Sequence, residues 1–236
     1  MQLFYQPQLS ENDTTIVFGK GESRHLGKVL RKKENDVLHV TNGNGLVFKA
    51  RVLGTAPKKF TAQVILVEKK PPRPYYLHLA VAPTKLNDRY EWFLEKATEV
   101  GIHAITPITC HHSERTTVKT ERYEKIIQSA MKQSLQAYLP KLNPPMPLKD
   151  FFNIKHVEDQ TYIAHCGPTE KKPLKAQLRP NGAVLVLVGP EGGFSPTEIE
   201  TAVAHNFTPV SLGSTRLRTE TAAVVACHSV AFVNGV

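Results

Sequence analysis

Two glycine-containing segments in the C-terminal half have the residue types of a ligand-binding site. The first, Gly189-Pro190-Glu191-Gly192-Gly193-Phe194, directly follows an apolar run at residues 183–188. Such a run predicts a buried central strand, and ligands of parallel sheets bind beyond the carboxyl ends of the strands. Glycines let a ligand approach the backbone closely and leave amide groups free to bind it. The sequence therefore predicts a ligand-binding loop at residues 189–194.

The residues after this loop predict that it is held in place. Ser195-Pro196-Thr197-Glu198 combines a capping box with proline at the first helical position. The glycine spacing matches neither the P-loop nor the Rossmann fingerprint, and Glu191 disfavours a phosphate. A tight turn without a ligand remains the alternative. If the loop binds a ligand, a valine at Gly192 or Gly193 should block both the loop conformation and the close approach of the ligand.

A second segment has a related pattern. Residues 210–213 predict a strand that ends in glycine, and a polar turn with Arg216 and Arg218 leads into a helix from Thr219. Cys110, Cys166 and Cys227 lack the paired spacing of disulfides or zinc sites, so we expect buried, reduced thiols. Cys110-His111-His112 cannot all face one ion from a strand, and we expect no metal.

The elements that must position these loops alternate between strand and helix after residue 75. Alternation of this kind predicts an α/β fold with a mostly parallel sheet that is covered on both faces. One helix has a clear apolar stripe, formed by Leu86, Tyr90, Phe93, Leu94, Ala97 and Val100, with Gly101 ending it. The expected strands are 76–81, 104–108, 161–165, 184–188 and 209–212; the expected helices are 87–100, 120–139 (ended by Pro140), one after residue 195, and 219–233.

The N-terminal part has a different pattern. Residues 69–74 are charged and rich in proline, which predicts a linker between a domain at 1–70 and a domain at 75–236. Before the linker, runs at 37–40, 46–52 and 60–67 favour strands, and Asn42-Gly43-Asn44-Gly45 favours a hairpin turn. We expect a small β-barrel or meander with one helix near residues 23–31.

Positive charge is concentrated in this N-terminal part. The chain of 236 residues has a formal net charge of +9, of which +7 lies in residues 1–74. A basic module beside a nearly neutral one is typical of polyanion binding, although a solvated basic face is the alternative. The basic residues near the expected helix are Arg24, His25, Lys28, Arg31, Lys32 and Lys33.

The composition is that of a globular protein, with 41% hydrophobic and 22% charged residues. No apolar run is long enough to span a bilayer. The first residues lack the charged and apolar regions of a secretory signal. We therefore expect a soluble, cytoplasmic protein.

Several motifs together resemble one known family. They are residues 188–194, Leu212-Gly213, 217–222, Arg24-His25-Leu26, 29–31, 95–101, 113–115 and Gln133-Ser134. In this order they are similar to the ribosomal RNA small-subunit methyltransferase E family of the SPOUT superfamily, over nearly the whole chain. The resemblance implies an enzyme that uses S-adenosyl-L-methionine (SAM) to methylate nitrogen 3 of a uridine in 16S ribosomal RNA. It also implies a PUA-like N-terminal β-barrel, a homodimer and a C-terminal trefoil knot.

The resemblance also assigns site residues. The cofactor pocket would contain Ala164, His165, Gly189, Glu191, Gly192, Gly193, Leu212, Gly213, Leu217 and Thr219. Arg218 is the catalytic candidate, because its guanidinium can contact a phosphate or the uracil oxygens but cannot act as a base at neutral pH. RNA would be bound by Arg24, His25, Arg31, Lys32, Lys33 and Arg115. The apolar final helix independently favours a homodimer.

The sequence leaves three points open. No residue is a compelling acceptor for the uridine proton: Glu220 is a candidate, but a glutamate at a helix start more often stabilises the helix dipole. His165 could simply pack or form hydrogen bonds. A PUA-like RNA-binding protein without catalysis and an α/β enzyme that acts on a nucleotide or small molecule are the competing functions.

Overall fold

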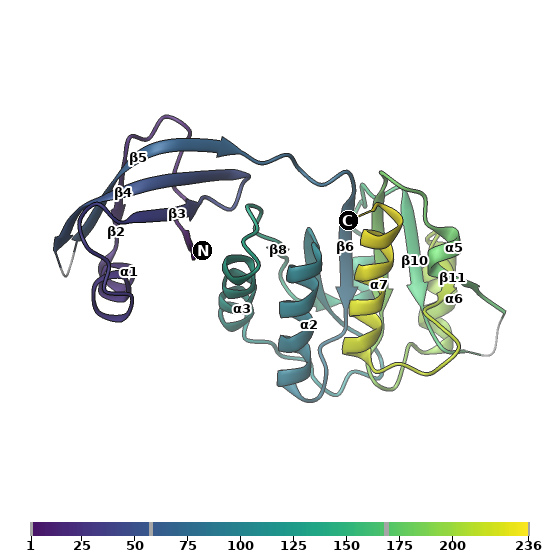
Figure 1. The fold of residues 1–236 in the computed structure, drawn as a ribbon. Helices are drawn as coiled ribbons and strands as arrows, with labels where there is room; N and C mark the ends of the chain where they lie inside the picture. Colours follow the sequence, from purple (N-terminus) through teal and green to yellow (C-terminus); the bar gives the residue numbers. More distant parts are fainter. Residues whose placement is uncertain (1, 57–58, 168–169, 236) are drawn as a thin grey trace. The chain divides into compact units, whose positions relative to one another are not determined.

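The computed structural model describes residues 2–56, 59–167 and 170–235. These residues form two compact units. The first unit comprises Met1–Pro72 together with Met131–Leu139, and the second comprises Arg73–Ala130 and Pro140–Val236. Figure 1 shows the course of the chain through both.

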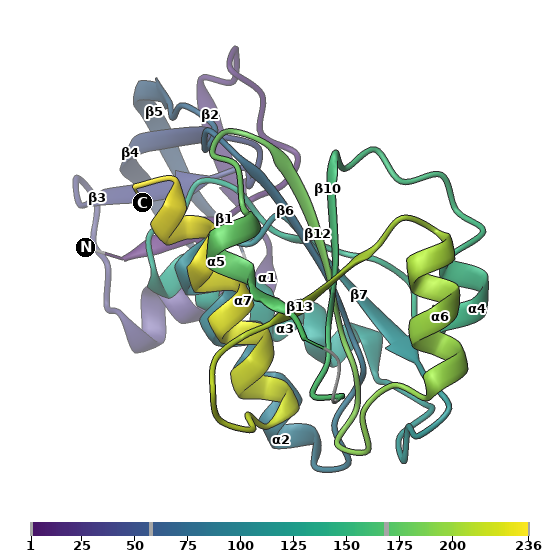
Figure 2. The same ribbon diagram turned by 90° about the vertical axis from the view of Figure 1, so that its right-hand side faces the viewer.

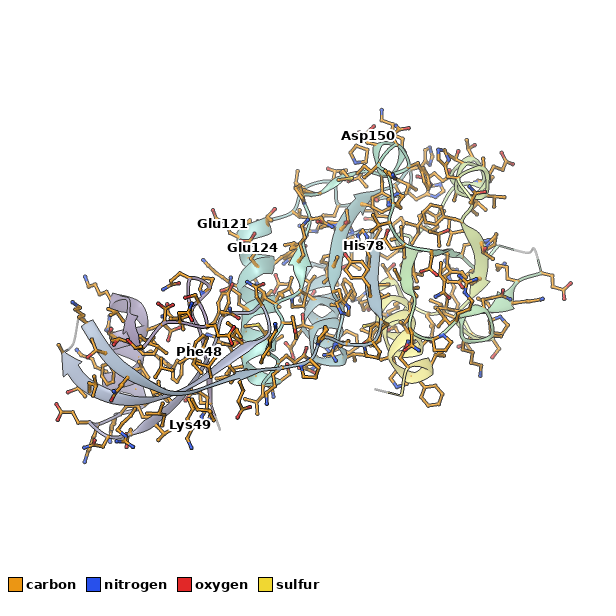
Figure 3. The ribbon with its side chains drawn as sticks, turned by 90° about the horizontal axis from the view of Figure 1, so that it is seen from above. Phe48, Lys49, His78, Glu121, Glu124 and Asp150 are labelled. Atoms are coloured by element: carbon orange, nitrogen blue, oxygen red, sulfur yellow. The ribbon has the colours of Figure 1, made fainter. Side chains whose placement is uncertain are left out.

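The first unit is built on a five-stranded sheet in the order β1-β3-β4-β5-β2. Only β1 and β3 pair in parallel; the other neighbours are antiparallel. On β4, Phe48 and Ala50 are fully buried while Lys49 and Arg51 are exposed, which is the alternation of a sheet with one covered face (Figure 3). The strands are β1 (Leu3–Tyr5), β2 (Thr15–Phe18), β3 (Val37–Thr41), β4 (Leu46–Ala56) and β5 (Lys59–Lys69).

The helical segment of this unit begins earlier than predicted. Helix α1 (Lys20–Arg24) continues into a π-helical turn, η1 (His25–Val29). The buried Ser23 hydroxyl anchors α1 by donating to the Phe18 carbonyl at 3.0 Å and accepting from the Phe60 amide at 2.9 Å. Beyond the turn, Arg31 has a left-handed backbone with φ of 52°, so the chain leaves the helix there.

The predicted helix 120–139 is wrong at its C-terminal end. Helix α3 spans Thr120–Gln133, and Leu135 then adopts a left-handed φ of 58°. The following residues pair with the hairpin loop of the first unit: the Gly45 amide donates to the Ala137 carbonyl at 3.0 Å, and the Leu139 amide to the Gly43 carbonyl at 2.8 Å. Long-range backbone pairing therefore overrides local helix propensity.

The second unit contains an eight-stranded sheet in which every pair is parallel. Its order is β11-β13-β10-β12-β6-β7-β8, with β9 beside β7. Figure 2 shows α2, α5 and α7 on one face and α4 and α6 on the other. The predicted α/β fold with a covered, mostly parallel sheet is thus confirmed. The strands are β6 (Tyr76–Val81), β7 (Ala104–Thr109), β8 (Lys141–Leu142), β9 (Met146–Pro147), β10 (Gln160–Ala164), β11 (Lys172–Pro173), β12 (Ala183–Val188) and β13 (Thr208–Ser211); the remaining helices are α2 (Asn87–Val100), α4 (Leu148–Phe151), α5 (Leu174–Gln177), α6 (Pro196–Ala204) and α7 (Thr219–Val233).

Two details of the predicted core need correction. Leu86 precedes α2 and is 48% exposed, so it does not belong to the apolar stripe of that helix. Cys110 and Cys227 are buried as expected, and burial raises the pKa of the Cys227 thiol to about 12. Cys166, however, is exposed, because it lies two residues beyond the end of β10, in a loop.

No helix in the described ranges is long and apolar enough to cross a bilayer. Nor does any group of three or more His, Cys, Asp or Glu side chains there have an arrangement that could hold a metal ion.

A buried polar chain crosses the sheet near the start of β6 (Figure 3, His78). Asn143 donates to the Thr106 hydroxyl at 2.8 Å, and that hydroxyl lies 2.7 Å from His78 Nε2. His78 Nδ1 lies 2.9 Å from Glu158 Oε1. Because Thr106 accepts from Asn143, its own proton is available for Nε2, which leaves Nδ1–H to donate to the carboxylate. Burial raises the pKa of Glu158, but the His78 hydrogen bond and other favourable contacts outweigh it, so the net pKa is lowered.

We predict that Glu158→Gln reduces the free energy of unfolding at pH 7 by about 1.5–3 kcal/mol, because it removes the charge from a buried hydrogen bond with His78. Since the folded-state pKa lies below the ordinary value, the stabilisation is complete above the ordinary value and is lost as the pH falls through the folded one. Urea unfolding at pH 7 and at acidic pH measures this. The exposed Lys85–Glu114 pair supplies the control Glu114→Gln, for which we expect about 0–1 kcal/mol. Equal losses for the two variants at pH 7 would contradict the prediction.

Candidate functional site

Loops from three neighbouring strands of the second unit enclose one cavity. It has a volume of about 810 Å³ and adjoins a smaller cavity of about 460 Å³ that shares part of its wall. Gly189, Glu191, Gly192, Gly193, Arg218 and Thr219 line the larger cavity, Leu212 and Gly213 line the smaller, and Ala164, His165 and Leu217 line both. The structure therefore brings together all the residues that the sequence assigned to the cofactor pocket, with the catalytic candidate Arg218 among them.

The register of the sheet explains why these loops meet. Ala164, the last residue of β10, is level with Val188 of β12 and with Val210 of β13. Parallel strands that end at the same level deliver their loops to the same edge of the sheet. The three segments are therefore adjacent although they are far apart in the sequence.

The glycines of the 189–194 loop are required for different reasons. Gly193 has a left-handed φ of +73°, and a Cβ added there would meet no atom within 4 Å. A Cβ on Gly192 would instead lie 2.8 Å from the Cβ of His112. Steric crowding by a neighbouring loop therefore already excludes a side chain at Gly192, a reason that the sequence did not reveal. At Gly193 the left-handed backbone favours glycine, and the open space beside it would let a ligand approach the backbone, as predicted.

The β7–α3 loop supports the glycine loop. His112 Nδ1 lies 3.1 Å from the Gly193 carbonyl, to which it donates. The predicted capping box of α6 is present, with Ser195 and Glu198 bonded reciprocally. Glu198 Oε1 also accepts from the His111 amide at 2.8 Å. His112 thus holds the glycine loop, and the backbone of His111 holds the capping residue Glu198 of α6.

Glu191 joins the glycine loop to the loop after β6. Its Oε1 accepts from the Lys85 amide at 2.9 Å, whereas its Oε2 is buried and has no hydrogen-bond partner. Arg115, predicted to bind RNA, donates to the Thr84 carbonyl at 3.0 Å and to the Lys85 carbonyl at 2.9 Å. The Arg115 guanidinium therefore holds the β6–α2 loop that in turn fixes Glu191.

The start of α7 closes the cavity on another side. The Thr219 hydroxyl donates to the Gly189 carbonyl at 3.0 Å, so it links the two predicted loops directly. Arg218, the N-cap of α7, is exposed and lines the cavity. Within the described part of the chain, no hydrogen bond or ion pair holds its guanidinium. Glu220 is not part of the cavity wall; its Oε1 lies 3.9 Å from Arg89 Nε on α2.

Comparisons with known proteins identify this arrangement. A family model described as an RNA methyltransferase domain matches residues 71–231, and one described as an RNA methyltransferase PUA domain matches residues 18–65. Ribosomal RNA small subunit methyltransferase E of Buchnera aphidicola is 30% identical, over 89% of this chain and 85% of its own length. The chain belongs to the ribosomal RNA small subunit methyltransferase E family.

Two crystal structures are similar to the protein over nearly the whole of both chains. A probable rRNA-methyltransferase from Porphyromonas gingivalis has a TM-score of 0.91 and 36% identity, covering 100% of this chain and 99% of its own. A ribosomal RNA small subunit methyltransferase E from Neisseria gonorrhoeae, bound to S-adenosyl methionine, has a TM-score of 0.89 and 26% identity, covering 99% and 98%. The resemblance stated from the motifs is thereby confirmed.

The predicted RNA-binding residues of this methyltransferase E family member lie in both units. Arg24 and Arg31 are exposed on α1 and in the turn after η1, with Lys33 exposed beside them. His25 and Lys32 are half-buried. The Lys32 amide donates to the Leu26 carbonyl at 2.9 Å, so this basic turn has a defined conformation. Arg115 alone lies in the second unit.

A side chain at Gly192 and one at Gly193 should destabilise the protein for different reasons. Gly192→Ala should lower the melting temperature because its Cβ meets His112. The loss should be much smaller when Gly192→Ala is measured against His112→Gly, which itself lacks the hydrogen bond to the Gly193 carbonyl. Gly193→Ala should cost roughly 1–2 kcal/mol, the cost of a left-handed conformation for a residue with a Cβ. Removing His112 should not recover that cost. Thermal unfolding of the single and double variants checks this, and equal rescue of both glycine variants would contradict it.

Proposed function

We propose that the protein transfers a methyl group from SAM to nitrogen 3 of a uridine in 16S ribosomal RNA. The observation that carries this proposal is the cavity at the ends of β10, β12 and β13, built from the glycine loop, the 212–219 segment and His165 in a chain of this family. The related structure from Neisseria gonorrhoeae, which contains S-adenosyl methionine, supports the choice of methyl donor. The family name supports ribosomal RNA as the substrate, and the motifs quoted above support nitrogen 3 of uridine.

The cavity wall fits this methyl donor. Gly193 and Gly213 leave open space where a Cβ would project, which allows close approach to the backbone. His165 Nδ1 accepts from the Gly167 amide at 3.2 Å, so the ring proton resides on Nε2, which is buried without a partner. Burial, and then the charge of Lys171, lower the pKa of His165 and keep the ring neutral. A ligand acceptor opposite Nε2–H would satisfy this donor.

Residues that surround the cavity would hold SAM, the methyl donor, and the target uracil. Bound SAM supplies an electrophilic methyl group. The cofactor-binding residues are those already assigned: Ala164, His165, Gly189, Glu191, Gly192, Gly193, Leu212, Gly213, Leu217 and Thr219. Arg218 would stabilise the negative charge that develops on the uracil oxygens as nitrogen 3 loses its proton, since a fixed cation at that point is most effective in the transition state. Holding both reactants in line would supply much of the rate.

The first unit would bind the RNA. Its net positive charge and the exposed Arg24, Arg31 and Lys33 suit phosphate contacts, which release counterions from the RNA. The match of residues 18–65 to a PUA domain of RNA methyltransferases supports this role. We further infer a homodimer, a trefoil knot formed by the C-terminal segments, an RNA substrate within the small ribosomal subunit, and a cytoplasmic location. For the dimer, Phe232 of α7 is 72% exposed and offers an apolar contact.

Titration of the purified protein tests the proposal. We expect SAM to bind with a measurable heat, and ATP and NAD to bind much more weakly, because the glycine loop lacks the lysine and the spacing of a phosphate cradle. Small ribosomal subunits from a deletion strain, incubated with the protein and SAM, should gain one methyl group on a uridine. Mass spectrometry of the digested RNA locates that group and shows whether it is on nitrogen 3.

Other outcomes would point elsewhere. RNA binding without SAM binding would favour a PUA-like RNA-binding protein without catalysis. Preferential binding of ATP or NAD would favour an α/β enzyme that acts on a nucleotide or small molecule. Light scattering of the same sample at micromolar concentration tests the dimer. A mass of one chain, 26.3 kDa, would overturn that inference.

A pair of variants separates RNA binding from catalysis. Neutralising Arg31, Lys32 and Lys33 together should weaken RNA binding and flatten its salt dependence, with SAM affinity unchanged. Arg218→Ala should lower turnover more than RNA affinity, because it removes an interaction made mainly in the transition state. Low salt or excess subunits should therefore rescue the triple variant and not the Arg218 variant. If low salt or excess subunits restore turnover of both variants equally, Arg218 only contacts a phosphate and has no catalytic role.

A further inference from the structure

Glu191, a residue of the cavity wall, has a carboxylate oxygen that no group in the described structure satisfies. Glu191 Oε2 is buried and lacks a hydrogen-bond partner, while Oε1 of the same group is fixed by the Lys85 amide at 2.9 Å. A buried charged acceptor without a partner is costly, on the order of 1–3 kcal/mol or more. Such a cost in a cavity wall indicates that a bound molecule supplies the missing donor.

The described residues that line the larger cavity offer few other proton acceptors. His165 Nδ1 accepts from Gly167, which leaves a proton on Nε2, so the buried nitrogen of that ring is a donor. Cys166 and Glu200 are exposed, where they compete with solvent water. Arg216 and Arg218 cannot accept a proton at neutral pH.

Glu220, the other candidate, lies outside this wall. Its Oε2, like that of Glu191, is buried without a hydrogen-bond partner among the described residues, but its Oε1 lies 3.9 Å from Arg89 Nε on α2. Thr219 and Ala222 line the cavity and Glu220 does not, because successive residues of a helix point in directions about 100° apart. Of the two described glutamates with a buried, unpartnered carboxylate oxygen, Glu191 is therefore the one that lines the cavity.

We propose that Glu191 is the general base of the reaction: its Oε2 takes the proton from nitrogen 3 of the target uracil. The inference rests on the proposed function. As the proton moves to Oε2, the electron pair of the N–H bond remains on nitrogen 3 and forms the new N–CH₃ bond, and the electrons of the S–CH₃ bond leave with sulfur. Glu191 then passes its proton to water. Uridine, SAM and Glu191 are converted to N3-methyluridine, S-adenosylhomocysteine and protonated Glu191, so atoms and charge balance.

The surroundings of Glu191 suit this role. The Lys85 amide fixes one oxygen and so directs the other. Lys85 itself pairs with Glu114 at 2.7 Å, and its charge acts on Glu191 from the β6–α2 loop. From the β13–α7 loop, Arg216 Nη2 lies 3.5 Å from the Glu191 carbonyl, and Arg218 lines the same cavity. His112 packs against the neighbouring Gly192 from the β7–α3 loop. Glu191 therefore lies among basic side chains from two other loops.

Glu191→Gln tests the proposal with little change of shape. The amide oxygen of glutamine can still accept from the Lys85 amide, and only Oε2 is replaced by a group that cannot take a proton. We expect turnover on small ribosomal subunits to fall by about 100-fold or more, which is the usual contribution of a general base. Glu191 lines the cofactor pocket, but glutamine keeps the acceptor for the Lys85 amide, so SAM affinity, measured by calorimetry, should fall far less than turnover. The melting temperature should stay near that of the unchanged protein.

Two further measurements separate a base from a structural residue. Turnover of Glu191→Gln should rise about tenfold per pH unit across the neutral range, because hydroxide must then remove the proton, while the unchanged protein should be less dependent on pH there. Subunits assembled with 16S RNA that contains 5-fluorouridine offer a more acidic imide. With that substrate the difference between Glu191→Gln and the unchanged protein should shrink by about tenfold.

Glu198→Gln is the matched control. Both oxygens of Glu198 accept from backbone amides, of His111 and of Ser195, so its loss should lower the melting temperature, and 5-fluorouridine should not restore any lost turnover. An equal defect of Glu191→Gln on both RNA substrates would overturn the proposal. So would a loss of SAM affinity large enough to explain the lost turnover, because Oε2 would then bind the cofactor. If the unchanged protein itself forms no N3-methyluridine, the proposed function fails instead.

Discussion

The level at which three parallel strands end is the constraint on which the cavity depends. Ala164 on β10, Val188 on β12 and Val210 on β13 are in register, so the loops that follow them converge at one edge. A shift of one residue in a strand would reverse which side chains face the helices, and the fully buried residues of β12 make such a shift costly. The geometry of the loops is therefore set by packing in the sheet, far from any ligand.

Hydrogen bonds from side chains to the backbone then fix the loops themselves. Thr219 bonds the Gly189 carbonyl, His112 the Gly193 carbonyl, and Glu191 the Lys85 amide. Each bond joins segments that belong to different strand ends, and each satisfies a backbone group that would otherwise need water or ligand. The cavity is thus held open by a network whose members are mostly not ligand contacts, which is how a preorganised site is maintained.

The sequence predicted what depends on local pattern. Strand 76–81 and helices 87–100 and 219–233 have the bounds of β6, α2 and α7. The strand is a short apolar run, α2 has an apolar stripe that ends at Gly101, and α7 is a long apolar segment. The cavity residues were also predicted, since glycines at strand ends are a local signal. Strands such as β1, β8, β9 and β11, of two or three residues, are too short to show any period. The supporting roles of Lys85, Arg115 and His112 could not be predicted, because their partners are up to 106 positions away.

Residues 131–139 have a consequence for how the chain is made. They complete the first unit by pairing with its hairpin loop at Gly43 and Gly45, yet they leave the ribosome only after β6, α2 and β7 of the second unit. The first unit therefore cannot finish folding while it is the only part synthesised, and it must wait with unpaired backbone groups on its hairpin. A fragment cut at the proline-rich linker would remain in that waiting state, so the two halves of the molecule are separate in structure but not in biogenesis.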